Sequence, residues 1–460
     1  MTTPVERQTS ESCSEPVTRP LRLARTFEAG ASAACTASVI VWRFELPALV
    51  PALLAFAAAV LTIDLARREH AEPSSITPTV VVIAALLVVA VVRAPNFPTD
   101  IRSYAADGRM LAHYHANPYL VRPSHFHYDP MYLHIPNSTA PYGPLFIGPA
   151  AVLSRVAGTS EVWTRLAYQA AAGAAIAVAL VVLWRSCRSS AAIVLVGLHP
   201  VVAGTIVNGG HNDAFVGLFL LVAVLAAERK RFASAGLVLA AAMLIKITAG
   251  LALLPLTLWA ARRGRRVAWF LGVSILVMVV PVILFVPGLV GSIRSADFGL
   301  VTRTSIWNLD PVRAPRISSA GDGAVTQLAL LCIGLAVIWV AWGQRELSDR
   351  VTGCVAAWLL LSAYVMPWYT VWALPVAALH PRHPFTRVVA WQGAIVVTAF
   401  LLPRRLLANH AISLSFGWIA PAALLAAFAF ALRGGAPGNS SRSGKGLVRA
   451  RDLGRSLPSA

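Results

Sequence analysis

The sequence predicts an all-α polytopic membrane protein with about 12–14 transmembrane helices and a large first external loop. Of its 460 residues, 57% are hydrophobic and 13% are charged, whereas about a quarter of the residues in a soluble domain are charged. Apolar runs recur along the whole chain, and most approach the roughly 17–25 residues that a helix needs to cross a bilayer. The clearest runs are residues 46–65, 77–92, 166–184, 191–207, 267–286, 327–342 and 414–432.

Arginine and lysine account for the net charge of +19 and set the expected orientation. They gather in short connections between apolar runs, and such clusters mark the cytoplasmic side of a membrane protein. Basic clusters in these positions suit anionic lipid headgroups, so we expect no nucleic acid partner. The clusters are Arg67 with Arg68, Arg185 with Arg188, residues 229–231 and residues 262–266. The sequence therefore predicts a multi-pass protein of the plasma membrane, in contact with its lipid bilayer.

Counting crossings from a cytoplasmic N-terminus divides the chain into three parts. We expect residues 1–28 to be a disordered cytoplasmic segment, residues 29–432 to form the membrane region and residues 433–460 to be a disordered basic cytoplasmic tail. Within the membrane region, residues 93–161 form the first external loop and residues 287–323 the second. Residues 233–260 are too few for two full crossings. We therefore expect two half-spans there that bend near Lys246.

The first external loop carries the residues expected for chemistry at a membrane surface. Charged, irregular backbone beside a bilayer persists mainly where it lines a cavity or a site. Two prolines precede Asp100, so a helix can begin at Thr99 or Asp100. On that helix Tyr104 and Asp107 fall near positions i+4 and i+7 and share a face with Asp100. Asp100 is then either a functional carboxylate or a helix N-cap.

Five of the eleven histidines also lie in this loop, between residues 113 and 134. Two of them, His125 and His127, form a His-x-His pair that directs both rings to one face of an extended segment. No third ligand of fixed spacing completes a metal site, and the five cysteines have no metal-binding or disulfide spacing. We expect no metal, and the histidines either line a polar ligand or belong to a plain loop.

A polar turn and a lone lysine follow in the membrane region. Residues 208–213 form a compact turn between two apolar runs, which is either solvated or part of a site. Its polar side chains after the two glycines are His211, Asn212 and Asp213. Lys246 lies inside an apolar run, where a lysine usually has a partner or a ligand. The alternative is a structural lysine that snorkels to the interface.

Aromatic residues mark a further segment at the expected outer face. Residues 367–375 contain Trp368 and Tyr369. A generic belt of interfacial aromatic residues explains this segment by itself. Its position also allows it to line a site with the first external loop.

Several short motifs occur in a fixed order along the chain. They are Thr99-Asp100-Ile101-Arg102-Ser103-Tyr104, Asp107-Gly108-Arg109, Asn117-Pro118-Tyr119, Ala140-Pro141-Tyr142-Gly143-Pro144-Leu145, Gly210-His211-Asn212-Asp213-Ala214, Lys246 in its apolar run, and residues 367–375. Together they resemble the glycosyltransferase C superfamily, and most closely the polyprenyl-phosphomannose-dependent α-mannosyltransferases of the actinobacterial cell envelope. The resemblance runs from about Pro95 to Pro375. The insert between Tyr119 and Pro141 does not match that family's pattern.

The resemblance implies inverting transfer of a mannosyl-type sugar from a polyprenyl phosphate to a hydroxyl of a glycan or glycolipid on the extracytoplasmic face. The lipid-linked sugar is then a substrate, and no separate cofactor is expected. The family's catalytic base maps onto Asp100. The leaving phosphate would meet Lys246 with Arg303 or Arg313, and sugar faces would stack on Tyr104, Tyr142 and Trp368. Further substrate contacts are expected from Arg102, Arg109, Tyr119, His125, His127, His211, Asn212, Asp213 and Tyr369.

Two other functions stay open. A transporter or flippase of a lipid-linked sugar or small solute would also have many spans, broken helices and a cation at mid-depth. The sequence shows no internal repeat between its halves, and the large outer loop favours an enzyme. The same class of enzyme could also use another polyprenyl-phosphate sugar, such as arabinofuranose or glucose.

Overall fold

The computed structural model describes most of the chain. The described residues are 18–41, 49–71, 76–127, 137–264, 266–295, 300–308, 317–319, 324–402, 406 and 409–434. Helices dominate this part, and a two-stranded antiparallel pair, β1 (Leu300–Thr302) with β2 (Ile317–Ser319), is the sheet within it. The predicted all-α class is therefore confirmed.

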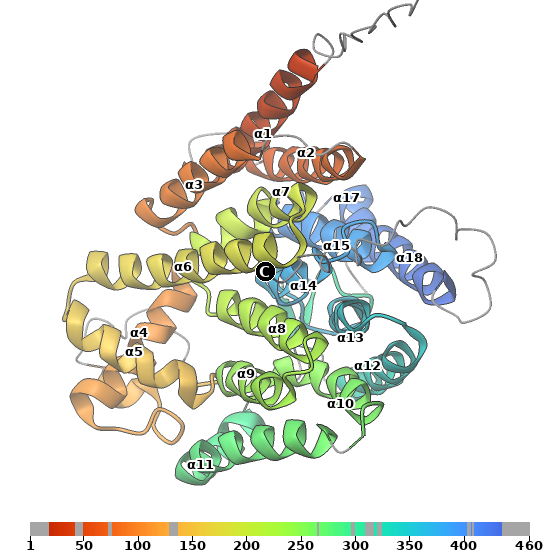
Figure 1. Cartoon of the computed structure of the whole chain (residues 1–460). Helices are drawn as coiled ribbons and strands as arrows, with labels where there is room; N and C mark the ends of the chain where they lie inside the picture. The colour runs from red at the N-terminus through yellow and green to blue at the C-terminus, as the bar shows by residue number, and fades with distance from the viewer. Residues whose placement is uncertain are drawn as a thin grey trace, which may run out of the picture.

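The helices follow one another with short connections and pack into a single bundle (Figure 1). The N-terminal part comprises α1 (Thr18–Val41), α2 (Val50–Ala71), α3 (Thr77–Val92), α4 (Thr99–Tyr114), the 3₁₀ turn η1 (Pro123–Phe126), α5 (Pro144–Ala157), α6 (Glu161–Cys187) and α7 (Ser190–Gly197). The middle comprises the π turn η3 (Val202–Val207), α8 (Asp213–Glu228), α9 (Phe232–Ile245), η4 (Ile247–Ala252), α10 (Leu253–Ala261) and α11 (Arg266–Ser295). The C-terminal part comprises α12 (Ala324–Gly343), α13 (Leu347–Leu361), η5 (Pro367–Trp372), α14 (Leu374–Ala377), α15 (Pro384–Leu401), α17 (His410–Leu414), η6 (Ser415–Ile419) and α18 (Ala420–Gly434).

Five helical stretches in the described part are long and apolar enough to cross a membrane. They are Val50–Glu69, Glu161–Cys187, Ala324–Gly343, Pro384–Leu401 and His410–Arg433. Five shorter apolar helices accompany them, at Thr77–Val92, Pro144–Ala157, Phe232–Ile245, Ile247–Ala261 and Arg266–Val279. The total of 12–14 crossings stays a prediction, because length and composition identify only the five full-length candidates.

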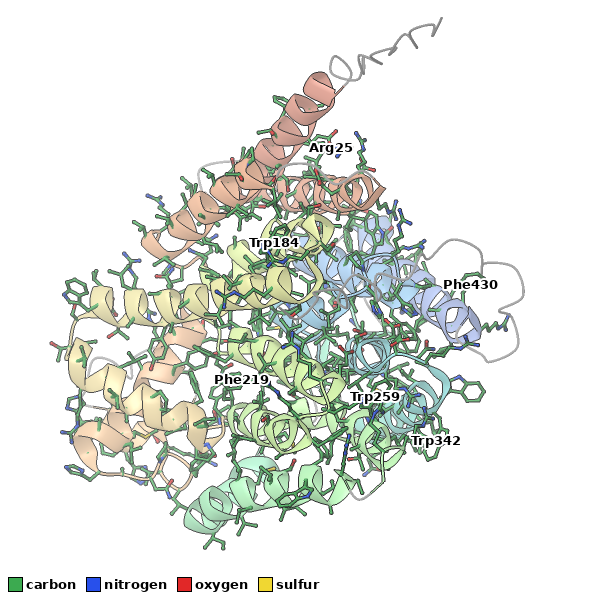
Figure 2. The ribbon with its side chains drawn as sticks, in the orientation of Figure 1. Arg25, Trp184, Phe219, Trp259, Trp342 and Phe430 are labelled. Atoms are coloured by element: carbon green, nitrogen blue, oxygen red, sulfur yellow. The ribbon has the colours of Figure 1, made fainter. Side chains whose placement is uncertain are left out.

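Large apolar side chains lie on the outside of the bundle, as a lipid-facing surface requires. Trp342 on α12 and Phe430 on α18 both project from the outer helices in Figure 2. Their exposed fractions are 59% and 73%. The interior is filled instead by alanine, valine and leucine, which let neighbouring helices approach closely. At Gly236 a β-carbon would come within 2.4 Å of the Phe270 carbonyl on α11, so a residue without a side chain is required there.

The backbone bends at Lys246, as the shortage of residues between 233 and 260 predicts. Helix α9 ends at Ile245, and Lys246 is extended, with φ −150° and ψ 116°. The chain then continues through η4 into α10. A second irregularity, the π turn η3, leads into residues 208–213. Such interruptions are frequent at functional sites because they free backbone and redirect side chains.

One expected boundary is wrong at the N-terminus. Residues 1–28 were predicted to be disordered, but α1 begins at Thr18 and continues to Val41 without interruption. Part of the reason is that α1 is held by ion pairs with α2, through Arg25 to Glu69 at 3.7 Å and Arg68 to Glu28 at 2.8 Å. At the other end, α18 continues to Gly434, and the rest of the predicted tail lies outside the described residues.

Candidate active site

Helix α4 brings Asp100 to the polar turn at residues 208–213. The N-cap of α4 is Pro98, which has no side chain that can cap, and Asp100 lies in the first helical turn. Its Oδ2 lies 3.2 Å from Nδ1 of His211. The side chain of His211 is 2% exposed, whereas that of Asp100 is 27% exposed. Asp100 is therefore directed toward His211 and is not the helix cap that the sequence also allowed.

The turn that carries His211 is buried, so the alternative of a solvated turn is excluded. Gly210 has φ +60°, a conformation that L side chains rarely adopt. Asn208 anchors the turn, since its Oδ1 accepts a hydrogen bond from the Asn96 backbone N–H at 3.1 Å and its Nδ2 donates to the Ala90 carbonyl at 3.2 Å. The end of α3 and the start of its connection to α4 are thereby fixed to the turn.

Asp213 and Lys246 form a buried ion pair next to this turn. Nζ of Lys246 donates to Oδ1 of Asp213 at 2.8 Å, and Nε1 of Trp372 donates to the same oxygen at 2.6 Å. The Asp213 side chain is 0% exposed and that of Lys246 is 15% exposed. Lys246 thus has a specific partner in the protein interior, in contrast to a snorkelling lysine. The break between α9 and η4 is what directs it there.

Aromatic rings enclose both groups. The His211 ring stacks on Trp368 with centroids 4.1 Å apart and an interplanar angle of 17°. The ammonium of Lys246 lies 4.5 Å from the Tyr369 ring centroid and 5.9 Å from that of Tyr142. Edge-to-face contact joins Tyr142 to Tyr104, with centroids 4.9 Å apart. Residues 367–372 therefore line the site and do not form a lipid-facing belt.

The loop that carries Tyr142 is held against the broken helix. Gly143 donates its backbone N–H to the Ile245 carbonyl at 3.0 Å. A β-carbon on Gly143 would come within 2.0 Å of the Leu244 carbonyl oxygen, so only glycine permits this approach. Tyr119 adds a hydrogen bond from its hydroxyl to the Tyr142 carbonyl at 2.7 Å. The segment before α5 is thus fixed to the end of α9, beside Lys246.

Two carboxyls on α4 differ in ionisation. Burial raises the pKa of the Asp100 carboxyl, but the contact and charge of His211 and the charge of Lys246 outweigh burial, so this pKa lies below its ordinary value. Burial raises the pKa of Asp107 well above its ordinary value. At neutral pH Asp100 is consequently a carboxylate, whereas burial favours the protonated form of Asp107.

Several predicted residues lie apart from this cluster. Arg102 is 4.0 Å from Glu161, and both line a cavity of about 280 Å³ between α4 and α6. Arg109 is buried and donates to the Gly158 carbonyl at 2.8 Å, which joins α4 to the end of α5. Arg303 donates to the Ser413 hydroxyl at 2.9 Å and lines a separate cavity of about 30 Å³.

The remaining predicted residues are His125, His127 and Arg313. His125 and His127 are exposed in and just after η1. Arg313 lies outside the described residues. Among the described residues, no group of three or more His, Cys, Asp or Glu side chains could hold a metal ion.

Two aromatic residues of the site were not among the predicted ones. Trp372 belongs to the motif at residues 367–375, and its indole N–H could have been identified as a partner for a buried carboxylate. Tyr364 lies just before that motif in the irregular stretch after α13. Burial and the negative charges of Asp100 and Asp213 raise the pKa of Tyr364, so its hydroxyl remains a hydrogen-bond donor. Nothing in the local sequence signals this residue.

Long apolar helices surround Asp100, His211 and the Asp213–Lys246 pair together with their aromatic neighbours. This is the arrangement of an integral membrane protein with a polar site that suits a hydroxyl-rich or charged ligand. A family model described as "Alpha-(1->6)-mannopyranosyltransferase, N-terminal domain" matches residues 15–263. This is more than half of the chain, and the chain belongs to that family. The resemblance drawn from the sequence motifs is thereby confirmed.

Individual relatives agree with the family assignment. Alpha-(1->6)-mannopyranosyltransferase A of Mycobacterium tuberculosis is 26% identical over 354 residues, which cover 67% of this chain and 66% of the relative. The A protein of Corynebacterium glutamicum is 25% identical over 62% of this chain and 67% of its own length. Alpha-(1->6)-mannopyranosyltransferase B of the same organism is 27% identical over 68% of this chain and 60% of its own length. The matches thus span about two thirds or less of these relatives, and no solved structure matches the chain.

Proposed function

We propose that the protein is an inverting mannosyltransferase that moves a mannosyl-type sugar from a polyprenyl phosphate to a hydroxyl of a glycan or glycolipid. The observation that carries the proposal is the partly exposed Asp100 carboxylate, held against His211 beside the buried Asp213–Lys246 pair. Asp100 accepts the proton of the acceptor hydroxyl while that oxygen attacks the anomeric carbon. The bond from that carbon to the donor phosphate breaks, and the polyprenyl phosphate leaves.

Asp100 is favoured over the neighbouring carboxyls by ionisation and access. Asp213 is fully buried and already accepts hydrogen bonds from Lys246 and Trp372. Asp107 is 4% exposed, and burial raises its pKa and so favours its protonated form. A general base must be ionised and must reach the proton that it accepts. Asp100 meets both requirements, with a side chain that is 27% exposed.

Polar atoms without a protein partner support a sugar site at the same turn. Nδ2 of Asn212 and Oδ2 of Asp213 are buried and have no hydrogen-bond partner among the described residues. Buried polar groups in native proteins are almost always paired. A sugar offers hydroxyls that donate and accept, so these two atoms suit sugar hydroxyls, and the nearby aromatic rings suit the apolar sugar faces.

Lys246 is the cation that we assign to the donor phosphate. An ammonium has three hydrogen-bond donors, and Asp213 is the one side-chain acceptor that the structure gives it among the described residues. The charge of Lys246 also acts on Asp100, which places the base and the phosphate partner in one site. A fixed positive charge beside the departing phosphate stabilises the negative charge that develops there. Arg303, held by Ser413, is the second candidate.

The orientation of the site follows from the positions of basic turns. Lys230 and Arg262 follow α8 and α10, and the other ends of these helices begin at Asp213 and lead back through η4 to Lys246. Since basic turns mark the cytoplasmic side, we infer that the site faces outward from the plasma membrane. The isoprenoid of the donor then lies in the bilayer, with its sugar phosphate at the outer surface.

Transfer in detergent tests this function directly. Purified protein is incubated with radiolabelled polyprenyl-phosphomannose and a mannoside acceptor, and the elongated product is isolated. Inversion to an α-linked product, which is the linkage in the relatives' names, requires a β-linked donor. We therefore expect label in the longer glycan from the β-linked donor and none from the α-linked donor. Equal use of both donors would contradict an inverting mechanism.

The same assay separates an enzyme from a transporter. A detergent solution has no compartments, so a transporter or flippase yields no covalent product there. Failure with mannose, arabinofuranose and glucose donors across several acceptors would exclude the transferase. A flux assay in vesicles would then test the transporter.

A further inference from the structure

A second polar cavity lies at the other end of the bundle from Asp100. Its volume is about 270 Å³, and it is formed where α2 packs on α15 and α7. Ile63 and Ala66 of α2, Leu195 of α7 and Ala390 of α15 are its buried apolar lining. Arg387 lies in the first turn of α15, whereas Phe400 near its last turn packs on Trp368 of the candidate site. Thirteen residues of helix separate the two ends by about 20 Å.

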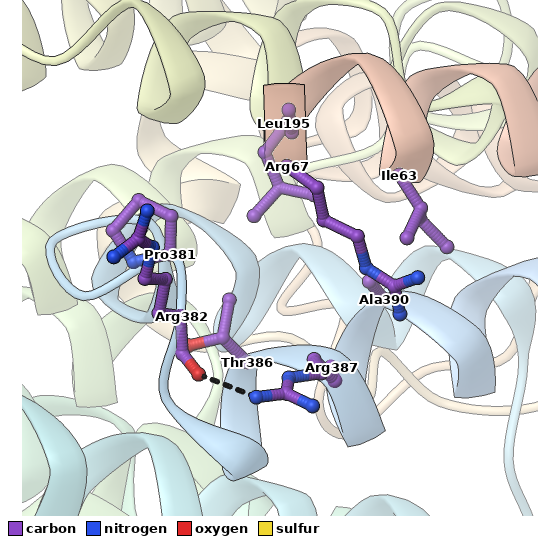
Figure 3. A pocket seen from close by; sticks show the side chains of 9 residues that line it. Ile63, Arg67, Leu195, Pro381, Arg382, Thr386, Arg387 and Ala390 are labelled. Carbon is purple, nitrogen blue, oxygen red and sulfur yellow. Dashed lines mark hydrogen bonds between the residues drawn. The ribbon is translucent and has the colours of Figure 1, made fainter. Parts of the chain in front are cut away.

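Three arginines from separate segments surround this cavity. Arg67 comes from the end of α2, Arg382 from the connection before α15, and Arg387 from α15 itself. Figure 3 shows the Arg67 guanidinium extending from α2 to the vicinity of Ala390. Among the residues that the structure describes, no carboxylate lines the cavity. Its rim is therefore strongly positive, and its inner wall is apolar.

The nearby carboxylates already have other partners. Asp64 and Glu28 pair with Arg68, at 2.5 and 2.8 Å, and Glu69 lies 3.7 Å from Arg25. Among the described residues, no ion pair involves Arg67, Arg382 or Arg387. Three uncompensated cations around one cavity repel one another, and an anion between them relieves that repulsion.

The loop that presents Arg382 is fixed in place. His380 lies 3.0 Å from Oδ1 of Asp349 on α13, and the Thr386 hydroxyl donates to the His380 carbonyl at 2.9 Å. Arg387 donates to the Arg382 carbonyl at 3.2 Å, the dashed line in Figure 3. The arrangement of the arginines is thus built by the fold and is not that of unrelated surface side chains.

The position of the cavity relative to the membrane spans indicates that the anion belongs to a lipid and is not free phosphate. Val50–Glu69 and Pro384–Leu401 are candidate membrane spans, and the cavity lies at the end of the first and the beginning of the second. It therefore lies where lipid headgroups meet the hydrocarbon. On α2, Leu53 and Phe56 are exposed, as lipid-facing side chains are. A phosphate at the arginines with its glycerol and first acyl carbons along Ile63 and Leu195 matches both the charge and the apolar wall.

We propose that this cavity binds the phosphate headgroup of an anionic lipid in the leaflet opposite the candidate active site. The arginines provide charge-assisted hydrogen bonds to the phosphate oxygens, for which their planar donor groups are suited. This lipid site is separate from the transferase site, so it can hold whether or not the proposed reaction is correct.

Binding of short-chain lipids in detergent tests the proposal. Thermophoresis of labelled protein is measured with dihexanoyl phosphatidylglycerol, dihexanoyl phosphatidylcholine and inorganic phosphate. We expect tighter binding of the phosphatidylglycerol than of the other two. Each arginine near an anionic surface contributes about a fivefold factor, so the triple variant R67Q/R382Q/R387Q should lose about a hundredfold in affinity. The single variant Arg382→Gln should lose about fivefold in affinity for phosphatidylglycerol. Because Arg382 is exposed, this variant should fold even if the triple variant does not, and it then tests the site by itself.

Arg185→Gln is the matched control, since Arg185 is an exposed arginine at the end of α6 outside the cavity. It should bind phosphatidylglycerol as the wild-type protein does. Equal affinity for phosphatidylcholine, or unchanged binding by the folded arginine variants, would overturn the site. If inorganic phosphate bound as tightly as phosphatidylglycerol, the cavity would be a site for free phosphate, and the proposal that it binds a lipid would be overturned.

Discussion

The two ends of α15 hold polar groups in opposite ways. Near Phe400, the Asp213–Lys246 pair is buried, compensated and surrounded by aromatic rings. Near Arg387, three exposed arginines surround a cavity that has no carboxylate. Both arrangements lie in the same apolar bundle, so the surrounding composition does not explain the difference.

The difference shows what each end can do. Paired, desolvated charges have little freedom to move, and they can hold a base and a phosphate partner in fixed geometry, as catalysis requires. Uncompensated charges at an interface attract any anion of suitable size, and their effect is screened by salt. The first end is thus suited to chemistry on a defined substrate, and the second to retention of a lipid. Substitutions at the first end should therefore affect turnover, pH dependence and stability in ways that surface arginines cannot.

The largest effect is expected from Asp100→Asn. The change preserves the shape of the side chain but removes the proton acceptor, so transfer should fall by about a thousandfold or more. The protein should still fold, because a partly exposed carboxylate on the first turn of α4 is replaced by an amide of equal size. Labelled product formed from polyprenyl-phosphomannose measures the rate, and thermal unfolding in detergent monitors the fold.

Asp107→Asn on the same helix is the matched control. Asp107 is buried, and burial raises its pKa and favours the neutral form that an amide resembles, so its amide variant should transfer sugar at close to the wild-type rate. Loss of activity in both variants would indicate that α4 tolerates no change. Near-normal transfer by Asp100→Asn would reject Asp100 as the base.

Breaking the buried ion pair should have the next largest effect. Lys246→Met leaves Asp213 as a buried carboxylate without its cation, which typically costs about 3–5 kcal/mol of stability. Asp213→Asn leaves a buried lysine and should be similarly destabilising. The double variant K246M/D213N removes both charges and should recover much of the stability, measured by thermal or denaturant unfolding.

Activity should not recover with stability in the double variant. Lys246 is proposed to bind the donor phosphate, so all three variants should transfer slowly. Full activity in a stable double variant would show that the pair is structural only. Arg67→Gln, at the other end of the bundle, should leave the stability close to that of the wild-type protein.

His211→Gln should change the pH profile. His211 lowers the pKa of Asp100 against the effect of burial. Without His211, burial dominates and the pKa of Asp100 rises. The acid limb of kcat/KM should therefore move to higher pH, with a decrease in the plateau rate of about tenfold. A lower rate with an unmoved acid limb would indicate that His211 only supports the fold.

The sequence was sufficient for the class of fold, whereas the roles of the site residues stay predictions. Apolar runs with basic turns predicted the helical membrane bundle, and the positions of Asp100, His211, Asp213, Lys246 and Trp368 followed from motifs in a fixed order. These residues could be predicted because polar side chains in apolar surroundings are costly unless they have a role. The structure brings all five together.

The pairings inside the site could not be predicted, because they depend on three-dimensional packing. Asp213 pairs with Lys246 and Trp372, which are 33 and 159 residues away in the sequence. Arg109 resembles a phosphate ligand in the motif, yet it donates to the Gly158 carbonyl. The arginine cavity also depends on packing of α2 against α15. The sequence placed Arg67, with Arg68, in a basic cluster on the cytoplasmic side, but it did not indicate a cavity there.

The smallest expected effect is that of Asp107→Asn on the stability of the protein. Burial raises the folded pKa of Asp107 above the value of about 3.9 in an unfolded chain, so above about pH 4 the folded state favours the protonated carboxyl more than the unfolded state does. The contribution of the Asp107 carboxyl to folding stability is thus fully present below about pH 4, and it is lost as the pH rises. Asp107→Asn has no such dependence and should raise the midpoint of thermal unfolding by about 2 °C at pH 7. That gain should disappear below about pH 4, whereas Asp100→Asn should show the opposite trend, because a lowered pKa stabilises the folded protein only above about pH 4. A pH-independent effect of both variants would show that the two carboxyls of α4 do not differ in ionisation.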